Sequence, residues 1–393
     1  MRTRAIIQSA ALSCAVLVST LSPVFAAPQS GAPSGDPIKI GAIFAVTGPA
    51  AFLGAPEDKT ARMLVDQINK DGGLLGHPVQ LIVKDSMYDP AKAISFAKEL
   101  IDEDNVVAII GPTGSGETMA IKDICQKSGV PLISCASTEG IVNPLAKYVF
   151  KTAENDNLVV ERLYQALNQL GISKIGVICS NTGFGNGGKA QLEKYAPKYG
   201  ITVAISEVYD SNATDLSALL TKVDAAGVQA VVNWSIEPAQ AIVAKNMAQL
   251  KMKARLFQSH GFANIKFVQA AGAAAEGIVF PSGRVIIADQ LPDSNPQKKV
   301  LLKYASDYKA AYGEDASTFG GHAYDAILIL KAAIESAKST DPDKLVQAIE
   351  GIRSFSGAGG VFNFSPTDHN GLLIDSVEMM TVKDGKFVVW QGK

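Results

Sequence analysis

The chain has 393 residues, 47% of them hydrophobic, which is enough for about two domains with buried cores. Its formal net charge of −2 gives no reason to expect nucleic acid or an anionic membrane surface as a partner. The composition therefore favours a globular binding or catalytic protein over one that recognises a polyanion.

The first residues predict an export signal. Two arginines precede the mostly apolar run 6–18, and small residues around Ala26 offer a cleavage site. This run is too short to span a bilayer comfortably, and no later segment is long and apolar enough to do so. We therefore predict a signal peptide at residues 1–26, a flexible tail rich in Pro, Gly and Ser at residues 27–37, and a mature protein in the periplasm.

From residue 38 onward, strand-like and helix-like patterns alternate. Apolar β-branched runs predict strands, and apolar residues at helical spacing predict helices. In the first part, the pattern predicts strands at 38–45, 79–85, 106–110, 130–134 and 148–150, and helices at 56–70, 90–102 and after 118. It then restarts, with helices at 157–170, 186–198, 215–226 and 238–250 and strands at 174–179, 202–209, 229–233, 255–258 and 277–280. Such alternation predicts an α/β fold with two doubly wound parallel-sheet domains.

The remaining segments complete this prediction. Residues 297–351 have a mostly helical pattern, and residues 377–390 resemble a pair of strands joined by a turn. Two α/β domains that face each other at the carboxyl ends of their strands form a cleft, which is a common place for a small ligand. Together with the export signal, this layout predicts a binding protein that closes about a hinge.

Two turns in the first domain are the candidate binding elements. The strand 106–110 ends in the polar run 111–118, and the strand 130–134 ends in the polar run 135–139. In a parallel sheet both turns lie at the same edge, where N–H groups and hydroxyls at helix N-termini can hold an anion, most simply a carboxylate. A plain structural turn is the alternative. Glu117 replaces the lysine of a phosphate-binding loop, which excludes a nucleotide triphosphatase.

Catalytic patterns are missing from the sequence. The four histidines are scattered without metal-ligand spacing, and no GxSxG elbow is present. We therefore predict no enzyme activity, no metal and no cofactor. Cys125 and Cys135 are close enough in sequence for a disulfide in an oxidising compartment, but buried free thiols are the preferred interpretation for these and for Cys179.

Several motifs together resemble the periplasmic solute-binding proteins of ABC importers, in the family typified by the leucine/isoleucine/valine-binding protein. The motifs are Ile38–Gly41, Val46–Ala51, Leu53–Gly54, Ile68–Gly76, Val107–Pro112, Val130–Ser134, Gly183–Gly185 and Ala275–Gly277. The resemblance covers nearly the whole mature chain. It implies a type I periplasmic binding protein fold, with two lobes joined by a three-segment hinge.

The resemblance also implies lobe boundaries and partners. The N-terminal lobe is expected at 38–152 and 285–356, and the C-terminal lobe at 153–284 and 357–393. The hinge crossings are expected near 151–156, 281–290 and 356–370. The implied partners are a small carboxylate ligand and a membrane ABC permease, with no nucleic acid, and the protein is expected to be a monomer.

Residue by residue, the resemblance assigns the ligand carboxylate to the two turns, through Ser115, through the backbone of Ala136 and through the hydroxyl of Thr138. Phe184 stands where the family often has a tyrosine that packs on the ligand.

Two further positions follow from the resemblance. Leu53, or its neighbour Phe52, stands at the position that lines the side-chain pocket. Asp156 matches a hinge acid that can help to hold an α-ammonium group, and an N-cap of the following helix is its alternative role.

The sequence departs from the family at His260. The family's amino-acid binders have a glutamate there, which pairs with the ammonium group, whereas an imidazole can donate a hydrogen bond to an oxygen. A structural histidine is the alternative. Trp234 can supply an aromatic wall or ordinary packing.

Two ligand hypotheses therefore stay open. One is a branched-chain or other apolar amino acid, with Asp156 and Glu139 on the ammonium. The other is a small aromatic or keto acid without an ammonium. A receptor that feeds a signalling system is the alternative function.

Overall fold

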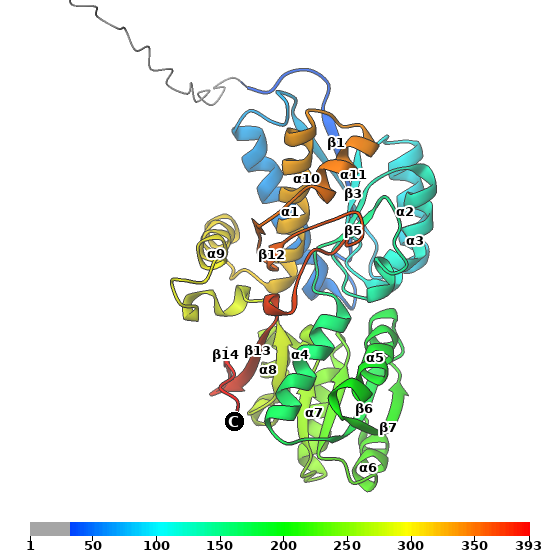
Figure 1. Ribbon diagram of the computed structural model, residues 1–393, viewed down its shortest axis with the longest axis vertical. Helices are drawn as coiled ribbons and strands as arrows, with labels where there is room; N and C mark the ends of the chain where they lie inside the picture. The colour runs from blue at the N-terminus through cyan, green and yellow to red at the C-terminus, as the bar shows by residue number, and fades with distance from the viewer. Residues whose placement is uncertain (1–31) are drawn as a thin grey trace, which may run out of the picture.

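The computed structural model describes residues 32–393, so the predicted signal peptide and its cleavage near Ala26 lie outside the described residues. The chain forms two lobes stacked along the long axis of the molecule (Figure 1). Within residues 32–393, no helix combines the length and the hydropathy that a membrane span needs.

The first lobe is built on a five-stranded parallel sheet with the order β2-β1-β3-β4-β5. Strands β1, β3, β4 and β5 are buried, as expected for a parallel sheet covered by helices on both faces, and the edge strand β2 is mostly half-buried. The strands are β1 (Ile38–Phe44), β2 (Val79–Asp85), β3 (Ala108–Ile110), β4 (Leu132–Ser134) and β5 (Val149–Lys151). The helices are α1 (Ala51–Lys70), α2 (Pro90–Asp102), α3 (Ser115–Ser128), α10 (Thr318–Ala337) and α11 (Pro342–Glu350). Helices α1 and α10 pack on one face of the sheet, and α2 and α3 on the other.

The second lobe has a seven-stranded sheet with the order β14-β13-β10-β9-β8-β6-β7, parallel except for the pairs that involve β13. The strands are β6 (Lys174–Ser180), β7 (Thr202–Tyr209), β8 (Ala230–Trp234), β9 (Arg255–Gln258), β10 (Val279–Ser282), β13 (Glu378–Lys383) and β14 (Lys386–Val389). The helices are α4 (Asp156–Gln169), α5 (Gly183–Tyr195), α6 (Ser217–Ala225), α7 (Ala239–Gln249) and α8 (Ile265–Ala271). The two sheets agree with the predicted fold class.

Two connections between the lobes leave the ends of β5 and β10. β5 ends at Lys151 and α4 begins at Asp156, which bounds the first crossing. The second crossing follows β10, which ends at Ser282, and leads through a short 3₁₀ segment to helix α9 (Lys298–Tyr312). A small hairpin of β11 (Phe355–Ser356) and β12 (Val361–Phe362) then precedes the return to the second lobe.

The segment 357–371 contacts the first lobe. The ring of His369 stacks on Phe150 of β5 with centroids 4.0 Å apart. The backbone N–H of Ala358 donates to the carboxylate of Asp325, on α10, at 2.6 Å. These contacts hold this segment beside β5 and α10.

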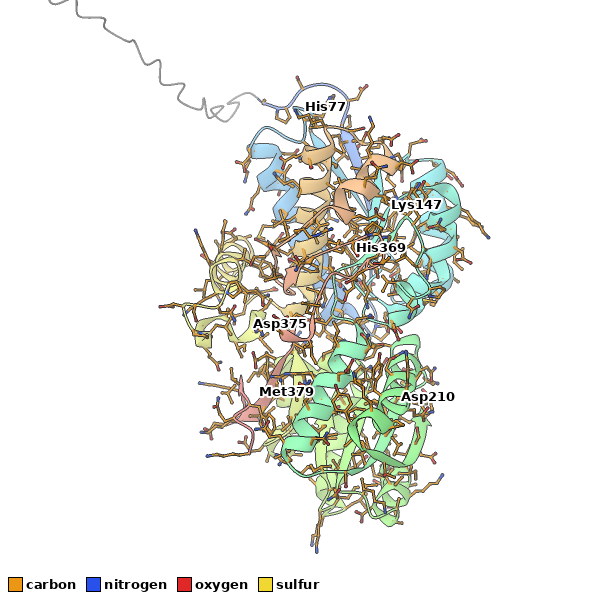
Figure 2. The ribbon with its side chains drawn as sticks, viewed as in Figure 1. His77, Lys147, Asp210, His369, Asp375 and Met379 are labelled. Carbon is orange, nitrogen blue, oxygen red and sulfur yellow. The ribbon has the colours of Figure 1, made fainter. Side chains whose placement is uncertain are left out.

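Figure 2 shows His369 in the first lobe, Asp375 between the lobes and Met379 in the second lobe. The predicted lobe boundaries stay predictions. The contacts of the preceding segment favour a third crossing near 372–377 over the predicted 356–370.

Helices α1 and α5 begin at other residues than predicted, and α8 was not predicted. Helix α1 begins five residues before Pro56, because a proline near a helix start omits only its own N–H bond and does not have to begin the helix. Helix α5 begins at Gly183 because Thr182 caps it by accepting the N–H of Gly185 at 3.2 Å. Helix α8, which the sequence did not predict, is capped by Asn264.

The two lobes are closed against each other. A Cβ atom added to Gly183 on α5 would lie 2.8 Å from the backbone nitrogen of Gly116 on α3. A Cβ atom added to Gly187 would lie 2.4 Å from Oγ1 of Thr138. The helix ends of the opposite lobes therefore approach so closely that only glycine fits between them.

Candidate ligand-binding site

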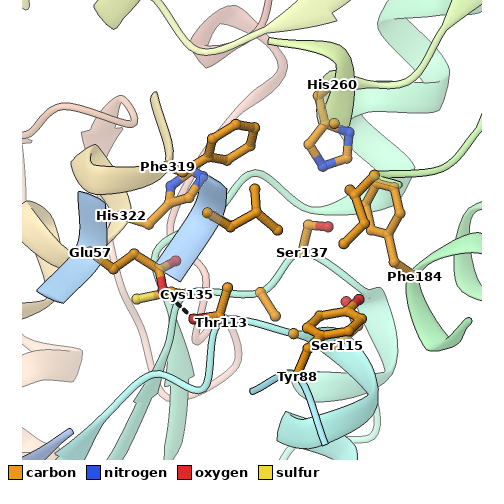
Figure 3. A pocket seen from close by; sticks show the side chains of 16 residues that line it. Glu57, Tyr88, Thr113, Ser115, Cys135, Ser137, Phe184, His260, Phe319 and His322 are labelled. Atoms are coloured by element: carbon orange, nitrogen blue, oxygen red, sulfur yellow. Dashed lines mark hydrogen bonds between the residues drawn. The ribbon is translucent and has the colours of Figure 1, made fainter. Parts of the chain in front are cut away.

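A cavity lies between the closed lobes, at the carboxyl ends of the strands, which is a common place for a small-molecule site. Both lobes and helix α10 line it (Figure 3). The lining residues are Leu53, Glu57, Tyr88, Thr113, Gly114, Ser115, Cys135, Ala136, Ser137, Ala153, Phe184, Ile236, His260, Gly261, Phe319 and His322.

Ser115 is the first residue of α3, and its hydroxyl is the best-placed donor for an anion. Gly114 precedes it as the N-cap, and its N–H donates to the carboxylate of Glu117 at 2.9 Å. Glu117 therefore closes the helix start, which explains why this loop carries an acid where a phosphate-binding loop has a lysine. Oγ of Ser115 accepts the N–H of Thr138 at 3.4 Å. The hydroxyl proton of Ser115 can then be donated to a ligand at the positive end of the helix dipole.

The second predicted turn presents fewer hydrogen-bond donors to the cavity than the sequence implied. Ala136 lines the cavity, but its N–H donates to Oγ of Ser134 at 3.0 Å, so that N–H is already used. Thr138 is buried behind the cavity wall, against Gly187 of the other lobe. The backbone of Ser137, between them, lines the cavity.

A buried cation supports this turn from behind. Nζ of Lys151 donates to the backbone oxygen of Ser137, and to Oδ1 of Asn155 at 2.7 Å. Burial lowers the pKa of Lys151, and the carboxylate of Asp156 opposes this shift. Because burial lowers the pKa of Lys151 to about 7 and Asp156 lies beside it, the main effect of Lys151 on the turn is the hydrogen bond that holds the backbone of Ser137.

Asp156 does not line the cavity. Asp156 is the first residue of α4, and Asn155 holds the N-cap position. The alternative prediction, that Asp156 is the N-cap, is therefore wrong by one residue. Burial raises the pKa of Asp156 to about 6, and both of its carboxylate oxygens have no hydrogen-bond partner among the described residues.

Aromatic rings from the second lobe form one wall. The ring centroid of Phe184 lies 5.1 Å from that of His260 and 5.8 Å from that of Trp234. Trp234 does not line the cavity and packs behind the other two rings, so it positions the wall and does not touch the space inside it. Across the cavity, Leu53 and Phe319 provide the opposite apolar surface.

Two neutral histidines face the cavity. Burial lowers the pKa of His260 to about 3 and that of His322 to about 4. Nδ1 of each ring is buried without a hydrogen-bond partner among residues 32–393. Each neutral ring has one N–H donor and one acceptor nitrogen, so the pair can hydrogen-bond a ligand without adding charge.

Sequence reasoning missed an acid in this cavity. Glu57 on α1 is buried, and its Oε2 accepts the hydroxyl proton of Thr113. Oγ1 of Thr113 in turn accepts the N–H of Ala45 at 3.0 Å. Burial raises the pKa of Glu57 well above its usual value. The available signal was its spacing, because Glu57 lies on the same helix face as Ala61 and Leu64 and so points into the protein.

Of the eight predicted site residues, the structure brings five together around the cavity and leaves three behind its walls. The five are Leu53, Ser115, Ala136, Phe184 and His260. The three are Thr138, Asp156 and Trp234. Phe52, the alternative to Leu53, lines two other surface hollows. Other lining residues besides Glu57 were also not predicted. Among them are Tyr88 and Thr113 in loops, and Phe319 and His322 on α10.

The cysteines are buried free thiols in the part of the chain that the structure describes. Cys125, Cys135 and Cys179 are all unpaired, as the preferred interpretation expected. Burial raises the pKa of Cys125 to about 12 and that of Cys179 to about 11. These thiols pack the cores, and Cys135 also lines the cavity.

Two lobes closed over a cavity at a helix start define a hinge-closing ligand-binding protein. The family model described as "Periplasmic binding protein" matches residues 37–386, and the chain belongs to that family. The family's members are solute-binding proteins and not enzymes, so the prediction that this chain is no enzyme is confirmed.

Relatives of known name share this architecture. Over 342 residues, the chain is 28% identical to the leucine-, isoleucine-, valine-, threonine- and alanine-binding protein of Pseudomonas aeruginosa, covering 84% of this chain and 89% of that protein. The crystal structure of an extracellular ligand-binding receptor from Rhodopseudomonas palustris HaA2 is 27% identical, with a TM-score of 0.85 over 91% of this chain and 100% of that one. The isoleucine complex of the binding protein LivJ from Streptococcus pneumoniae is 26% identical, with a TM-score of 0.78, covering 90% and 98%. The predicted type I periplasmic binding protein fold is confirmed.

Proposed function

We propose that this protein is the periplasmic substrate-binding component of an ABC importer, and that it captures a small carboxylic acid with an apolar body. The observation that carries the proposal is the hydroxyl of Ser115 at the start of α3, which faces a cavity with apolar walls. The carboxylate lies at the helix start, and the body packs between Leu53, Phe184 and Phe319. The predicted signal peptide supports the location.

An acid without an α-ammonium group is the favoured ligand. His260 occupies the position where the family's amino-acid binders have a glutamate, and its ring is neutral. The backbone oxygen of Ser137, which could accept from an ammonium, is instead bonded to Nζ of Lys151.

An apolar amino acid is the second candidate. Relatives with 26–28% identity carry names of branched-chain amino-acid binders. The acid that could pair with an ammonium in this cavity is Glu57, whose carboxylate can ionise if the ligand brings a cation. In this candidate Glu57, and not the predicted Asp156 or Glu139, holds the ammonium.

The proposed partner is a membrane permease that receives the ligand from the closed, monomeric protein. A receptor that presents the same closed form to a signalling protein is the alternative. Capture of the permease or of a sensor from membranes with the ligand-loaded protein separates these two functions.

Thermal-shift screening tests the ligand class, because a ligand that binds the folded state raises the melting temperature. The panel contains matched sets: leucine, 4-methyl-2-oxopentanoate and 4-methylpentanoate, and phenylalanine, phenylpyruvate and 3-phenylpropanoate. The proposal predicts shifts with the acids that lack the ammonium. A panel with no shift at all would contradict carboxylate capture.

The variant Ser115→Ala tests the anion site. Loss of one charge-assisted hydrogen bond should weaken every binding acid by about 10- to 100-fold. The variant Ser128→Ala, at the other end of α3, is the matched control and should bind as the wild type does. Equal affinity in Ser115→Ala would place the carboxylate elsewhere.

A further inference from the structure

A second group of polar side chains faces the cavity away from Ser115. Glu57, Thr113 and His322 come from α1, from the loop after β3 and from α10. Figure 3 shows Thr113 between Ser115 and Glu57, with His322 beside Glu57 on the far side. An apolar ligand tail would leave Oε1 of Glu57 and Nδ1 of His322 without partners, which is unfavourable in a buried site.

We infer that the ligand carries a second hydrogen-bonding oxygen, a hydroxyl or a carbonyl at the end remote from its carboxylate, and that Glu57 and His322 bind this oxygen. The inference rests on the proposed function, since the carboxylate at Ser115 fixes which end of the ligand faces Glu57. Glu57 and His322 then form the subsite that distinguishes one acid from another.

The hydrogen bonds around Thr113 fix the orientation of Glu57. The N–H of Ala45 donates to Oγ1 of Thr113, so the hydroxyl proton of Thr113 goes to Oε2 of Glu57. No hydrogen bond within residues 32–393 involves Oε1 of Glu57. This oxygen is therefore available to the ligand, while the other is held in place.

The two imidazoles add directional bonding without charge. Nδ1 of His322 and Nδ1 of His260 are buried and have no partner among the described residues. His322 lies on the Glu57 side of the cavity, and His260 lies across from it on the second lobe (Figure 3). A ligand hydroxyl or carbonyl oxygen can accept the proton that the neutral Glu57 carboxyl carries on Oε1, and a ligand hydroxyl can in turn donate to Nδ1 of His322.

A charged ligand group is unfavourable at the Glu57 end of the cavity. The lining contains no lysine or arginine, so a second carboxylate would meet the Glu57 carboxyl with no cation to compensate. An ammonium would require Glu57 to ionise in a buried place, where burial raises its pKa. A neutral oxygen needs no charge at all. The favoured class is an apolar, ring-containing or branched acid with a remote hydroxyl or carbonyl.

Calorimetric titration with matched pairs tests this inference. The pairs are benzoate with 4-hydroxybenzoate and phenylacetate with 4-hydroxyphenylacetate. We expect the hydroxylated member of at least one pair to bind about tenfold or more tightly, because a site built for a hydroxyl rejects the analogue that lacks it. Equal or weaker binding of both hydroxylated members would overturn the inference.

Variants of Glu57 separate the possible roles. Glu57→Met keeps the length of the side chain and should abolish the preference for the hydroxylated acid, whereas Glu57→Gln should keep most of it. If Glu57→Gln instead abolishes binding of leucine and phenylalanine, Glu57 is an ammonium partner and the inference is wrong. His322→Phe gives a second readout if Glu57→Met does not fold, and it should also reduce the preference.

Thr60→Val is the matched control. Thr60 lies one turn along α1 from Glu57 and makes a buried hydrogen bond of 2.9 Å with Tyr304, outside the cavity. This variant should lose stability without changing the preference between paired acids. If acids bind through Ser115 but show no preference, only this inference fails. If no acid binds, the proposed function fails as well.

Discussion

Closure of the two lobes depends on a glycine at their contact. Gly183, the first residue of α5, faces the start of α3, where a Cβ atom would lie 2.8 Å from the nitrogen and 2.9 Å from the Cα of Gly116. Ordinary contacts of a Cβ atom begin at 3.4 Å. In the variant Gly183→Ala the lobes must therefore stay about half an ångström further apart. Both helices are rigid at this point, so neither can move aside alone.

The cost of this separation gives the expected change in affinity. Overpacking by one methyl group costs roughly 1–3 kcal/mol when the surroundings are backbone. If the open form carries none of this cost, the affinity for the ligand falls by about 5- to 150-fold. The three atoms nearest to this methyl group all belong to the first lobe, so the melting temperature without ligand should stay within about 2 °C of the wild-type value.

Titration calorimetry measures the affinity, with the acid that gives the largest thermal shift as the ligand. Small-angle scattering of the loaded protein measures whether the lobes still close. Gly116→Ala is the matched control, since a Cβ atom there meets only Cγ of Pro90 at 3.9 Å. If Gly183→Ala binds within twofold of the wild type, the closed contact of α3 and α5 does not contribute to binding and the reasoning is refuted.

Three further predictions concern single groups. His260→Glu should shift the preference from acids without an ammonium toward the matched amino acids by about tenfold, measured by paired titrations, and an unchanged ratio would place His260 outside the ligand's reach. Burial raises the pKa of Glu154 to about 7, so the folded protein holds more protons than the unfolded chain above pH 4.5, and this group's contribution to stability falls as the pH rises from 5 to 8. The melting temperature of Glu154→Gln minus that of the wild type should therefore increase by roughly 5 °C from pH 5 to pH 8. If this difference is the same at both pH values, Glu154 does not become a buried charge in this range. The three buried cysteines should react with a thiol reagent only after unfolding, and rapid labelling of the native protein would contradict their burial.

Local patterns in the sequence determined the architecture of this protein. Alternating β-branched runs and helical spacings are properties of neighbouring residues, so the order of most strands and helices could be read directly, although the short helix α8 was missed. The position of Ser115 follows in the same way, because a polar turn after a buried strand places the next residues at a helix start. The boundary errors at α1 and α5 come from capping and proline effects, which shift a helix end without changing the pattern of its interior.

Tertiary structure alone decided which polar side chains face the ligand. Glu57 and Thr113 are 56 positions apart in the chain and meet only because α1 packs beside the end of β3. The sequence placed His260 near the ligand but gave no reason to look at His322, which α10 brings to the same cavity from the third part of the chain. Thr138 and Trp234 lie at the predicted ends of their strands and yet point behind the wall. The direction of a side chain at a lobe interface depends on how two lobes close, and no local pattern of residues records that geometry.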